Sequence, residues 1–262
     1  MVSGDRKILI TFDVEEFDTP LRHNISLSIE EQLQIGAEGL FEIADALDQL
    51  PFVEATFYTT AFFAQHFQTL IKRLAQKHEI ASHTFYHSRF SPEDILNSKV
   101  AIERITEKTI HGFRMPNLQN FDKKLLIDAG YLYDSSFCPT WIPGRYNYLN
   151  KSIYPVIEEE ILQIPASATP IFRIPLFWLS FKNFPFHVYV AMCKHTLART
   201  GFLNLYFHPW EFSDLTNINI PNYVKRIHGK ALTERLVRLI NVLSEDKRNS
   251  FVATFEFAKN YI

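Results

Sequence analysis

The sequence predicts a single-domain α/β fold built on a parallel sheet, either a βα barrel or a doubly wound sheet, and three observations favour it. Strand-like and helix-like segments alternate through the first half of the chain, the order that a parallel sheet with covering helices requires. The length of 262 residues is one that an α/β barrel often fills as a single domain. The composition, 47% hydrophobic and 21% charged, is that of a chain with a packed core.

The first half of the chain supplies the regular alternation. Residues 7–12 form an Ile-rich run, typical of a strand that is buried on both faces. Ser28 and Glu31 have the spacing of a capping box, and the helix that they open keeps apolar residues at helical spacing as far as Leu47. The pattern then predicts strands at 53–58, 79–82, around 113 and at 131–133, and helices at 60–76, 92–108 and 122–129.

The alternation breaks between Cys138 and Pro185, where seven of the 13 prolines fall. We expect an irregular insertion at about 138–185, with one strand near 160–164, that covers the carboxyl edge of the sheet and shapes the choice of substrate. Regular structure returns with helices at 188–199 and 233–243 and strands at 202–207 and 251–254. No shift in composition marks a linker, so residues 1–262 are predicted to form one domain.

Charge and composition exclude several classes of partner. The 27 basic and 29 acidic residues give a net charge of −2, which offers no general attraction to nucleic acid or anionic lipid. The apolar stretch 170–192 is interrupted by Lys182 and other polar residues, so we expect no integral membrane association. The chain shows no signal peptide and only two cysteines, which favours a cytoplasmic location. The sequence does not indicate the oligomeric state.

Polar side chains cluster after three of the predicted strands, at residues 11–16, 82–87 and 207–211. The carboxyl ends of parallel strands are where active sites assemble. Asp13 and Glu15 share one face of a strand whereas Glu16 points away, and a helical turn would stack His83 on His87. Two imidazoles and one carboxylate suit Zn²⁺ or another divalent first-row metal, which leaves the second carboxylate free to act as a base.

Each cluster also has a plain structural interpretation. An H-x-x-x-H pair is more often two packed or surface histidines than a metal site, and two adjacent glutamates after a strand are usually a solvated loop. His208, flanked by apolar residues, is also compatible with a buried histidine bonded to backbone. The chain contains no G-x-G-x-x-G, G-x-S-x-G or Walker motif, which disfavours the main nucleotide-binding folds and serine hydrolases of that type.

Taken in order, the clusters and their neighbours resemble the motifs of the polysaccharide deacetylases with a NodB homology domain, the carbohydrate esterase family 4 type. The resemblance spans residues 7 to about 212 and implies a distorted (β/α) barrel with about seven parallel strands, one divalent metal, and hydrolysis of an N-acetyl group on a sugar. The motifs that carry it are Thr11-Phe12-Asp13, Ala55-Thr56-Phe57-Tyr58, the run from His78 to His87, Gly112-Phe113-Arg114-Met115-Pro116, Tyr133-Asp134-Ser135-Ser136 and the run from Tyr206 to Glu211.

The resemblance also implies roles for individual residues. Asp13 matches the general base of the family, Arg114 the arginine that orients this base, and His208 the general acid. Asp134 would tune His208, although an Asp that caps a turn with the following serines is an equally good interpretation.

The metal ligands follow from the same resemblance. His83 and His87 match the metal histidines of the family. Many members have T-F-D-D-G, with the acidic ligand directly after the base, whereas this chain has Val14 there. It is similar to the branch with D-x-D or D-x-E, which makes Glu15 the ligand and leaves Glu16 as the alternative. Zinc is the first choice of ion, with Co, Mn or Ni as alternatives.

The implied reaction releases acetate and a free amine from an N-acetylated amino sugar of a poly- or oligosaccharide or of its biosynthetic precursor. The apparent lack of a signal sequence favours an intracellular precursor, nucleotide-linked or lipid-linked. Two alternatives stay open: a hydrolase of small cyclic amides or ureides on the same fold, and a catalytically decayed barrel that binds glycan. The two histidines argue against the first, and the complete set of site residues argues against the second.

Overall fold

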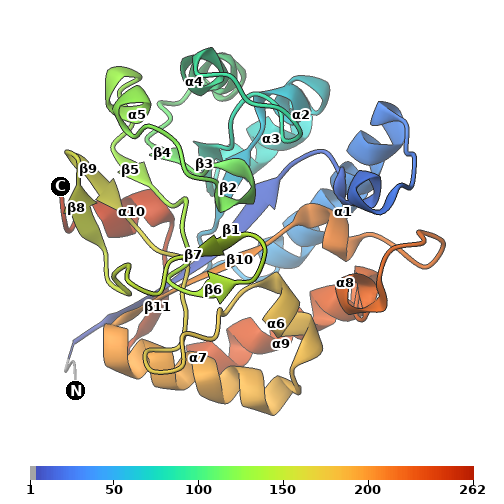
Figure 1. Ribbon diagram of the computed structural model, residues 1–262. Helices are drawn as coiled ribbons and strands as arrows, with labels where there is room; N and C mark the ends of the chain where they lie inside the picture. Colours follow the sequence, from blue (N-terminus) through green and yellow to red (C-terminus); the bar gives the residue numbers. More distant parts are fainter. Residues whose placement is uncertain (1–3) are drawn as a thin grey trace.

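A curled, mostly parallel sheet runs through the centre of the computed structural model, which describes residues 4–262 (Figure 1). Its strands lie in the order β10-β1-β2-β3-β4-β5-β9-β8, and β11 also pairs with β1. Neighbours are parallel except β8 and β9. The strands are β1 (Arg6–Val14), β2 (Thr56–Thr59), β3 (Glu79–Ser82), β4 (Gly112–Phe113), β5 (Tyr133–Asp134), β8 (Val156–Glu158), β9 (Ile161–Gln163), β10 (Phe202–Phe207) and β11 (Asn249–Phe251).

The sheet curls almost into a ring but is not closed by strand pairing in the described part of the chain. In place of a ladder between β9 and β10, two hydrogen bonds join Ser167 to β10: its N–H donates to the Asn204 carbonyl, and its Oγ accepts from the Asn204 N–H, each over 2.9 Å. The result is a half-barrel, which agrees with the distorted (β/α) barrel expected from the sequence.

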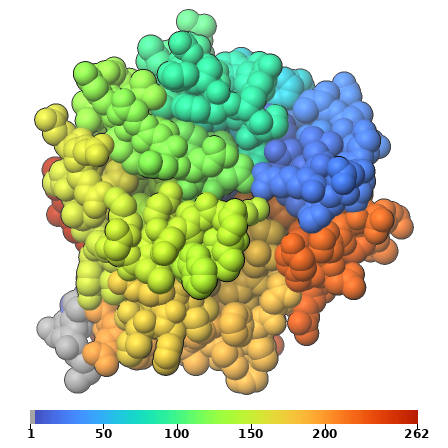
Figure 2. Space-filling view, viewed as in Figure 1, coloured from blue at the N-terminus to red at the C-terminus, as the bar shows by residue number. Residues whose placement is uncertain are grey.

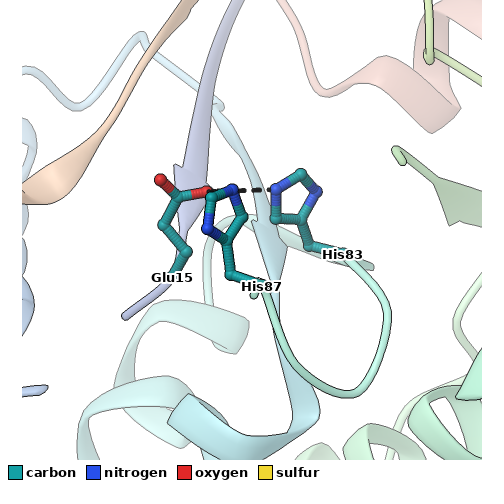
Figure 3. Close-up of side chains that lie close together, drawn as sticks. All are labelled: Glu15, His83 and His87. Carbon is teal, nitrogen blue, oxygen red and sulfur yellow. Dashed lines mark hydrogen bonds and ion pairs between the residues drawn. The ribbon is translucent and has the colours of Figure 1, made fainter. Parts of the chain in front are cut away.

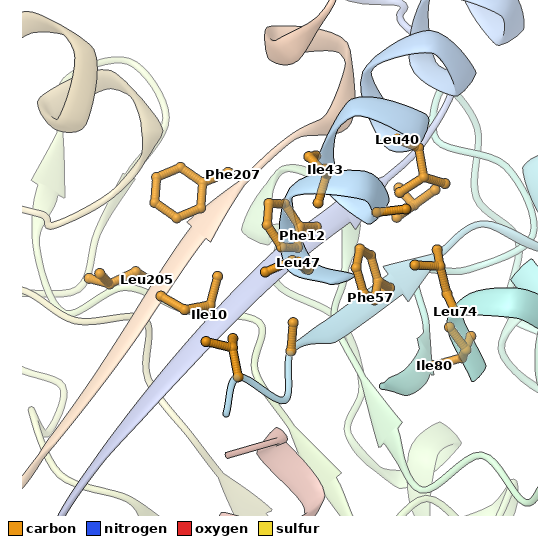
Figure 4. Packing of buried hydrophobic residues seen from close by; sticks show 14 of the residues in the cluster. Ile10, Phe12, Leu40, Ile43, Leu47, Phe57, Leu74, Ile80, Leu205 and Phe207 are labelled. Atoms are coloured by element: carbon orange, nitrogen blue, oxygen red, sulfur yellow. The ribbon is translucent and has the colours of Figure 1, made fainter. Parts of the chain in front are cut away.

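Helices surround the sheet and bury its outer face (Figure 1). Figure 4 shows the contact between β1, β2, β10 and α1, where Phe12 stacks on Phe57 with ring centroids 5.1 Å apart. The capping box of α1 is confirmed: the Glu31 N–H donates to Ser28 Oγ over 3.2 Å, and the Ser28 N–H donates to the Glu31 carboxylate over 2.8 Å. The helices are α1 (Ile29–Asp48), α2 (Ala61–His66), α3 (Gln68–Ala75), α4 (Glu93–Thr106), α5 (Lys124–Asp128), α6 (Trp178–Asn183), α7 (Phe186–Thr200), α8 (Asn222–Lys225), α9 (Gly229–Ser244) and α10 (Thr254–Ala258).

Several bounds move by a few residues, as for β2 and α9, and two predicted elements differ more strongly. The helix expected over 60–76 is two helices, because Phe67 leaves helical geometry at φ −122° and ψ 45° and packs its ring on Phe63. The strand expected over 251–254 ends at Phe251, and Thr254 begins α10. The Thr254 N–H donates to the Thr56 hydroxyl over 2.8 Å, so a side chain replaces the next ladder bond.

The segment 138–185 is less irregular than predicted. It contains the β6–β7 hairpin (Trp141–Ile142 and Tyr146–Asn147), the strand β9 that pairs with β5, the edge strand β8, and α6. Figure 2 shows its yellow-green part on the same face as the blue N-terminal segment. No helix in residues 4–262 is long and apolar enough to cross a lipid bilayer.

Two glycines let α1 lie directly on the backbone of the strand ends. A Cβ atom on Gly39 would lie 1.8 Å from the Pro209 carbonyl oxygen, and one on Gly36 would lie 2.9 Å from the Glu15 carbonyl oxygen. Both distances are shorter than a carbon–oxygen contact allows, so only glycine fits at either position. Helix α1 thereby fixes the ends of β1 and β10 relative to each other.

Candidate metal centre and active site

A buried group of one carboxylate and two imidazoles lies at the carboxyl end of the sheet (Figure 3). Glu15 follows β1, and His83 and His87 follow β3. Glu15 Oε2 lies 3.2 Å from His83 Nε2 and 3.0 Å from His87 Nε2. These three side chains are at most 7% exposed and their donor atoms lie within 4.8 Å of one another, which is the arrangement of a metal-binding triad.

The two histidines are brought together by a loop and not by the helical turn expected from their spacing. Residues 83–87 form no helix, and Thr84 takes the left-handed backbone conformation with φ 65°. The Thr84 hydroxyl donates to the Tyr86 carbonyl over 2.8 Å and braces this turn. The rings of His83 and His87 lie nearly parallel, with centroids 5.8 Å apart.

The second ring nitrogen of each histidine faces an acceptor. His83 Nδ1 donates to the Arg114 carbonyl over 2.7 Å, and His87 Nδ1 lies 2.8 Å from Asp18 Oδ2. Both Nε2 atoms, when the rings are neutral, therefore present lone pairs to the Glu15 carboxylate. Three acceptors facing one another call for a cation between them, so the donor set fits a divalent metal.

The electrostatic environment also favours a cation. Four acidic residues, Asp13, Glu15, Glu16 and Asp18, are buried within six positions of the chain. Burial lowers the pKa of His87, but Glu15 and Asp18 outweigh it and raise that pKa to about 9. The site thus attracts positive charge, as a proton or as a metal ion.

Glu16, the alternative acidic ligand, points to a different partner. Its carboxylate accepts a hydrogen bond from the Thr60 hydroxyl over 2.8 Å, and burial raises its pKa. The triad is therefore formed with Glu15, whose second oxygen accepts from Trp210 Nε1 over 3.2 Å.

Asp13 and Arg114 form a buried ion pair beside the triad. Arg114 Nη1 lies 2.6 Å from Asp13 Oδ1, and the same guanidinium donates to the Thr11 hydroxyl and to Ser135. Burial raises the pKa of Asp13, but the charges of Arg114 and the nearby histidines outweigh it, so the pKa is below its usual value. Asp13 is therefore ionised and able to accept a proton.

His208 faces Asp13 from the end of β10 and is held from behind. Its Nε2 lies 4.0 Å from Asp13 Oδ2, and its Nδ1 lies 3.0 Å from Glu211 Oε1, which also accepts the His208 backbone N–H. Lys182, fully buried on α6, lies 2.6 Å from Glu211 Oε2. Burial lowers the pKa of His208, but Glu15 and Glu211 outweigh it and raise the pKa overall.

Asp134 takes no part in this chain of contacts. Its carboxylate contacts Lys123 and Ser136, which is the turn-capping alternative, and no hydrogen bond to His208 is found in the described residues. Glu211 occupies the place that the sequence analysis gave to Asp134. Its position three residues after His208, the spacing of a capping box, was the available signal, and the structure contains that box.

A cavity of about 250 Å³ opens over these residues. Ile142, Tyr146 and Trp178 of the segment 138–185 line it together with Asp13 and His208. This segment therefore covers the carboxyl edge of the sheet, as predicted.

Comparisons with known proteins agree with the fold described above. Solved structures with a similar fold include one named as a polysaccharide deacetylase from Pseudomonas aeruginosa PAO1 (TM-score 0.69, 15% identity, covering 98% of this chain and 91% of that one) and one so named from Mycobacterium smegmatis (0.67, 16%, 99% and 91%). An allantoinase is also similar (0.67, 15%, 100% and 92%).

A search of curated proteins gives no match. The family model described as polysaccharide deacetylase matches residues 3–133, half of the chain, and includes Asp13, Glu15, His83, His87 and Arg114. The chain therefore belongs to the polysaccharide deacetylase family.

Proposed function

We propose that the protein removes the N-acetyl group from an amino sugar of a glycan or of a glycan precursor, with one divalent metal held by Glu15, His83 and His87. The observation that carries this proposal is the position of Asp13 and His208, which face each other across 4.0 Å beside the triad. Amide hydrolysis needs a group that takes a proton from water and a group that gives one to the leaving nitrogen. In this proposal Asp13 takes the proton from water and His208 gives one to the leaving nitrogen.

Asp13 acts as the base. Its ionised carboxylate accepts a proton from the attacking water, whose oxygen adds to the amide carbonyl carbon. A divalent ion in the triad would supply Lewis-acid activation of the water and the carbonyl oxygen. Arg114 is a positioning residue, because its bond to Asp13 Oδ1 leaves Oδ2 directed towards His208 and the cavity.

His208 acts as the acid. Its Nδ1–H is held by Glu211, so the Nε2–H of the protonated ring is the proton available on the cavity side. Donation from Nε2 to the amide nitrogen accompanies cleavage of the carbon–nitrogen bond and releases acetate and the free amine. Glu211 holds this ring and favours its protonated form, and Lys182 holds Glu211 in turn. Neither residue contacts the substrate in this proposal.

The lining of the cavity supports a sugar as the substrate. Tyr146, Trp178 and Tyr206 are among the aromatic side chains that line it, next to the carboxylates and His208. Aromatic faces with a few well-placed polar groups are what a pyranose ring requires. The segment 138–185 contributes the first two of these residues, so its sequence would govern which amino sugar is accepted.

The decisive experiment measures acetate release from a panel of N-acetylated monosaccharides and oligosaccharides, with the metal content determined on the same preparation. The His83→Ala and His87→Ala variants should lose both stoichiometric metal and acetate release. His195→Ala, which alters an exposed histidine on α7, should retain both.

Other outcomes would contradict the proposal. Turnover of cyclic ureides without acetate release would indicate a different hydrolase on the same fold. Glycan binding by a metal-loaded protein that releases no acetate would indicate a decayed enzyme. Full metal content in both histidine variants would place the metal elsewhere.

A further inference from the structure

The cavity over the triad continues into a larger outer cavity of about 710 Å³. The two cavities share six lining residues, so the passage between them is continuous; these are Arg22, His87, Asn117, Leu118, Arg145 and Tyr146. A substrate whose N-acetyl group lies at the triad therefore extends outwards past two arginines. Neither arginine has a role in the hydrolysis proposed above.

The two arginines come from different parts of the chain. Arg22 lies in the 3₁₀ helix Thr19–His23, and Arg145 lies in the turn of the β6–β7 hairpin. In Figure 2 the blue segment and the yellow-green segment that carry them adjoin on one face. Two positive side chains from distant parts of the sequence therefore converge on one passage.

Their hydrogen-bonding groups are largely unused. Arg145 is exposed, and no hydrogen bond or ion pair to its guanidinium occurs in residues 4–262. Arg22 donates from Nη2 to the Asn117 side chain over 2.7 Å, and the same atom lies 3.7 Å from Asp18. These contacts fix the guanidinium and leave its other N–H groups available to a ligand. A guanidinium carries five donors in a planar fork that matches a phosphate or a carboxylate.

The loop that holds Arg22 is itself strained. Asn117 and Leu118 take successive left-handed conformations, with φ values of 58° and 52°, although neither is glycine. Such conformations persist where a site requires a particular side-chain position. Here the strain presents the Asn117 amide to Arg22 at the junction of the two cavities.

The outer cavity would not need this charge for a neutral sugar. Gln119, Asn120, Tyr146 and Tyr148 already offer amide groups and aromatic rings, and the two tyrosine rings stack 4.7 Å apart. Amides and aromatic faces are sufficient to bind hydroxyl groups and pyranose rings. The arginines add a specific affinity for negative charge.

We infer that Arg22 and Arg145 form a subsite for an anionic group, a phosphate or a carboxylate, on or next to the N-acetylated sugar. The inference rests on the proposed function and narrows it to charged amino sugars. A phosphate would belong to an activated or carrier-linked precursor, and a carboxylate to an acidic sugar or an acidic polymer. The experiment separates these two sources.

The test compares kcat/KM for acetate release from four sugars: the neutral methyl glycoside of N-acetylglucosamine, N-acetylglucosamine 1-phosphate, N-acetylglucosaminuronic acid and N-acetylmuramic acid. We expect at least one anionic sugar to exceed the neutral one by tenfold or more, and the preferred anion identifies the source. Arg145→Ala should lower kcat/KM for that sugar by about 10- to 50-fold, mainly through KM, and leave the neutral sugar within twofold. Arg22→Ala should act in the same direction.

Arg226→Ala provides the matched control, because this exposed arginine lines neither cavity and its loss changes the net charge equally. The inference is wrong if the anionic sugars show no advantage, if Arg145→Ala affects neutral and charged sugars alike, or if the control has the same effect. An advantage that survives in both arginine variants would place the anion on the metal and would also overturn it.

Calorimetric binding separates this inference from the proposed function. If no sugar releases acetate, the hydrolysis is wrong, but N-acetylglucosamine 1-phosphate should still bind at least tenfold more tightly than the neutral glycoside and lose that advantage in Arg145→Ala. Equal binding of the two sugars would exclude the subsite irrespective of turnover.

Discussion

The two arms of the site that we propose for proton transfer use the same components in different ways. In the base arm, a buried cation, Arg114, contacts the carboxylate that reacts, Asp13. In the acid arm, a buried cation, Lys182, contacts a carboxylate, Glu211, that does not react but holds the ring of His208. The base arm joins β1 to the loop after β4, and its residues lie within the part of the chain matched by the family model. The acid arm lies outside that match.

The difference shows that one kind of ion pair can support either a proton-accepting or a proton-donating side chain. Next to Asp13, the guanidinium stabilises the charged form and keeps the pKa low, as a base requires. On the other side, Lys182 and His208 together lower the pKa of Glu211 despite its burial. The negative charges of Glu15 and Glu211 then raise the pKa of His208. An anion is maintained in both arms, but in the proposed mechanism only Asp13 takes up a proton.

Asp13→Asn should have the largest effect, because no other described carboxylate faces His208 Nε2 within 4.0 Å. We expect kcat to fall by about 10³- to 10⁴-fold with metal content unchanged. The measurement is steady-state acetate release together with elemental analysis. Asp128→Asn, an exposed position on α5, is the control and should be neutral. A metal-loaded Asp13→Asn enzyme with normal kcat would remove the base arm from the mechanism.

His208→Gln should have the next largest effect, about 10²- to 10³-fold in kcat, again with the metal retained. Water can protonate a leaving amine in part, so the loss should be smaller than for the base. A substrate with a better leaving group, such as an N-acetylated aniline, should show a smaller loss, because it needs less protonation. An equal loss on both substrates would mean that His208 only packs against Trp210 and Trp178.

Glu211→Gln should change the pH dependence of kcat/KM. His208 donates only while protonated, so kcat/KM should decline as pH rises through its raised pKa. Removal of the negative charge lowers that pKa, and this alkaline decline should move to lower pH. We expect a loss of about tenfold near pH 8 and little loss near pH 6. Glu234→Gln, on the exposed face of α9, should leave the profile unchanged, and an unshifted profile in Glu211→Gln would exclude the coupling.

Lys182→Met should have the smallest effect on rate, a few-fold, and a clear effect on stability. It leaves Glu211 buried without its cation, which typically lowers the free energy of unfolding by about 3 to 5 kcal/mol. The double variant Lys182→Met with Glu211→Gln should recover part of that stability but none of the alkaline activity. Chemical denaturation of the four proteins measures this coupling, and additive losses would show that the pair does not interact.

The base arm and the triad were largely predictable from the sequence, although Asp13 and Arg114 lie 101 positions apart, because the family motifs include both residues of that pair. Alternation along β1 puts Asp13 and Glu15 on one face, and the motif after β3 supplies both histidines. The helical turn expected for those histidines was wrong, because Thr84 adopts a left-handed conformation that spacing alone does not reveal.

The acid arm was only partly predictable, because the family resemblance assigns a role to His208 but none to Glu211 or Lys182. In the sequence, Lys182 interrupts an apolar stretch, but its partner Glu211 lies 29 positions further along the chain. Burial of such a charge demands a partner without indicating which one. The family motif predicts Asp134 as the partner of His208, whereas in the structure that partner is Glu211, three residues further along the chain.

Helix α1 makes the chemistry sensitive to residues that never approach the substrate. Replacing a helical glycine with alanine ordinarily stabilises a protein by up to about 1 kcal/mol, and engineers seeking heat resistance choose such positions first. In α1 the same replacement would drive a methyl group into the carbonyl oxygen of Pro209 or of Glu15. Relief of the overlap at Gly39 would displace the end of β10 by about 1 Å, and a misplacement of that size is enough to impair proton transfer. The tolerance of this protein for thermostabilising mutations should therefore end at Gly36 and Gly39.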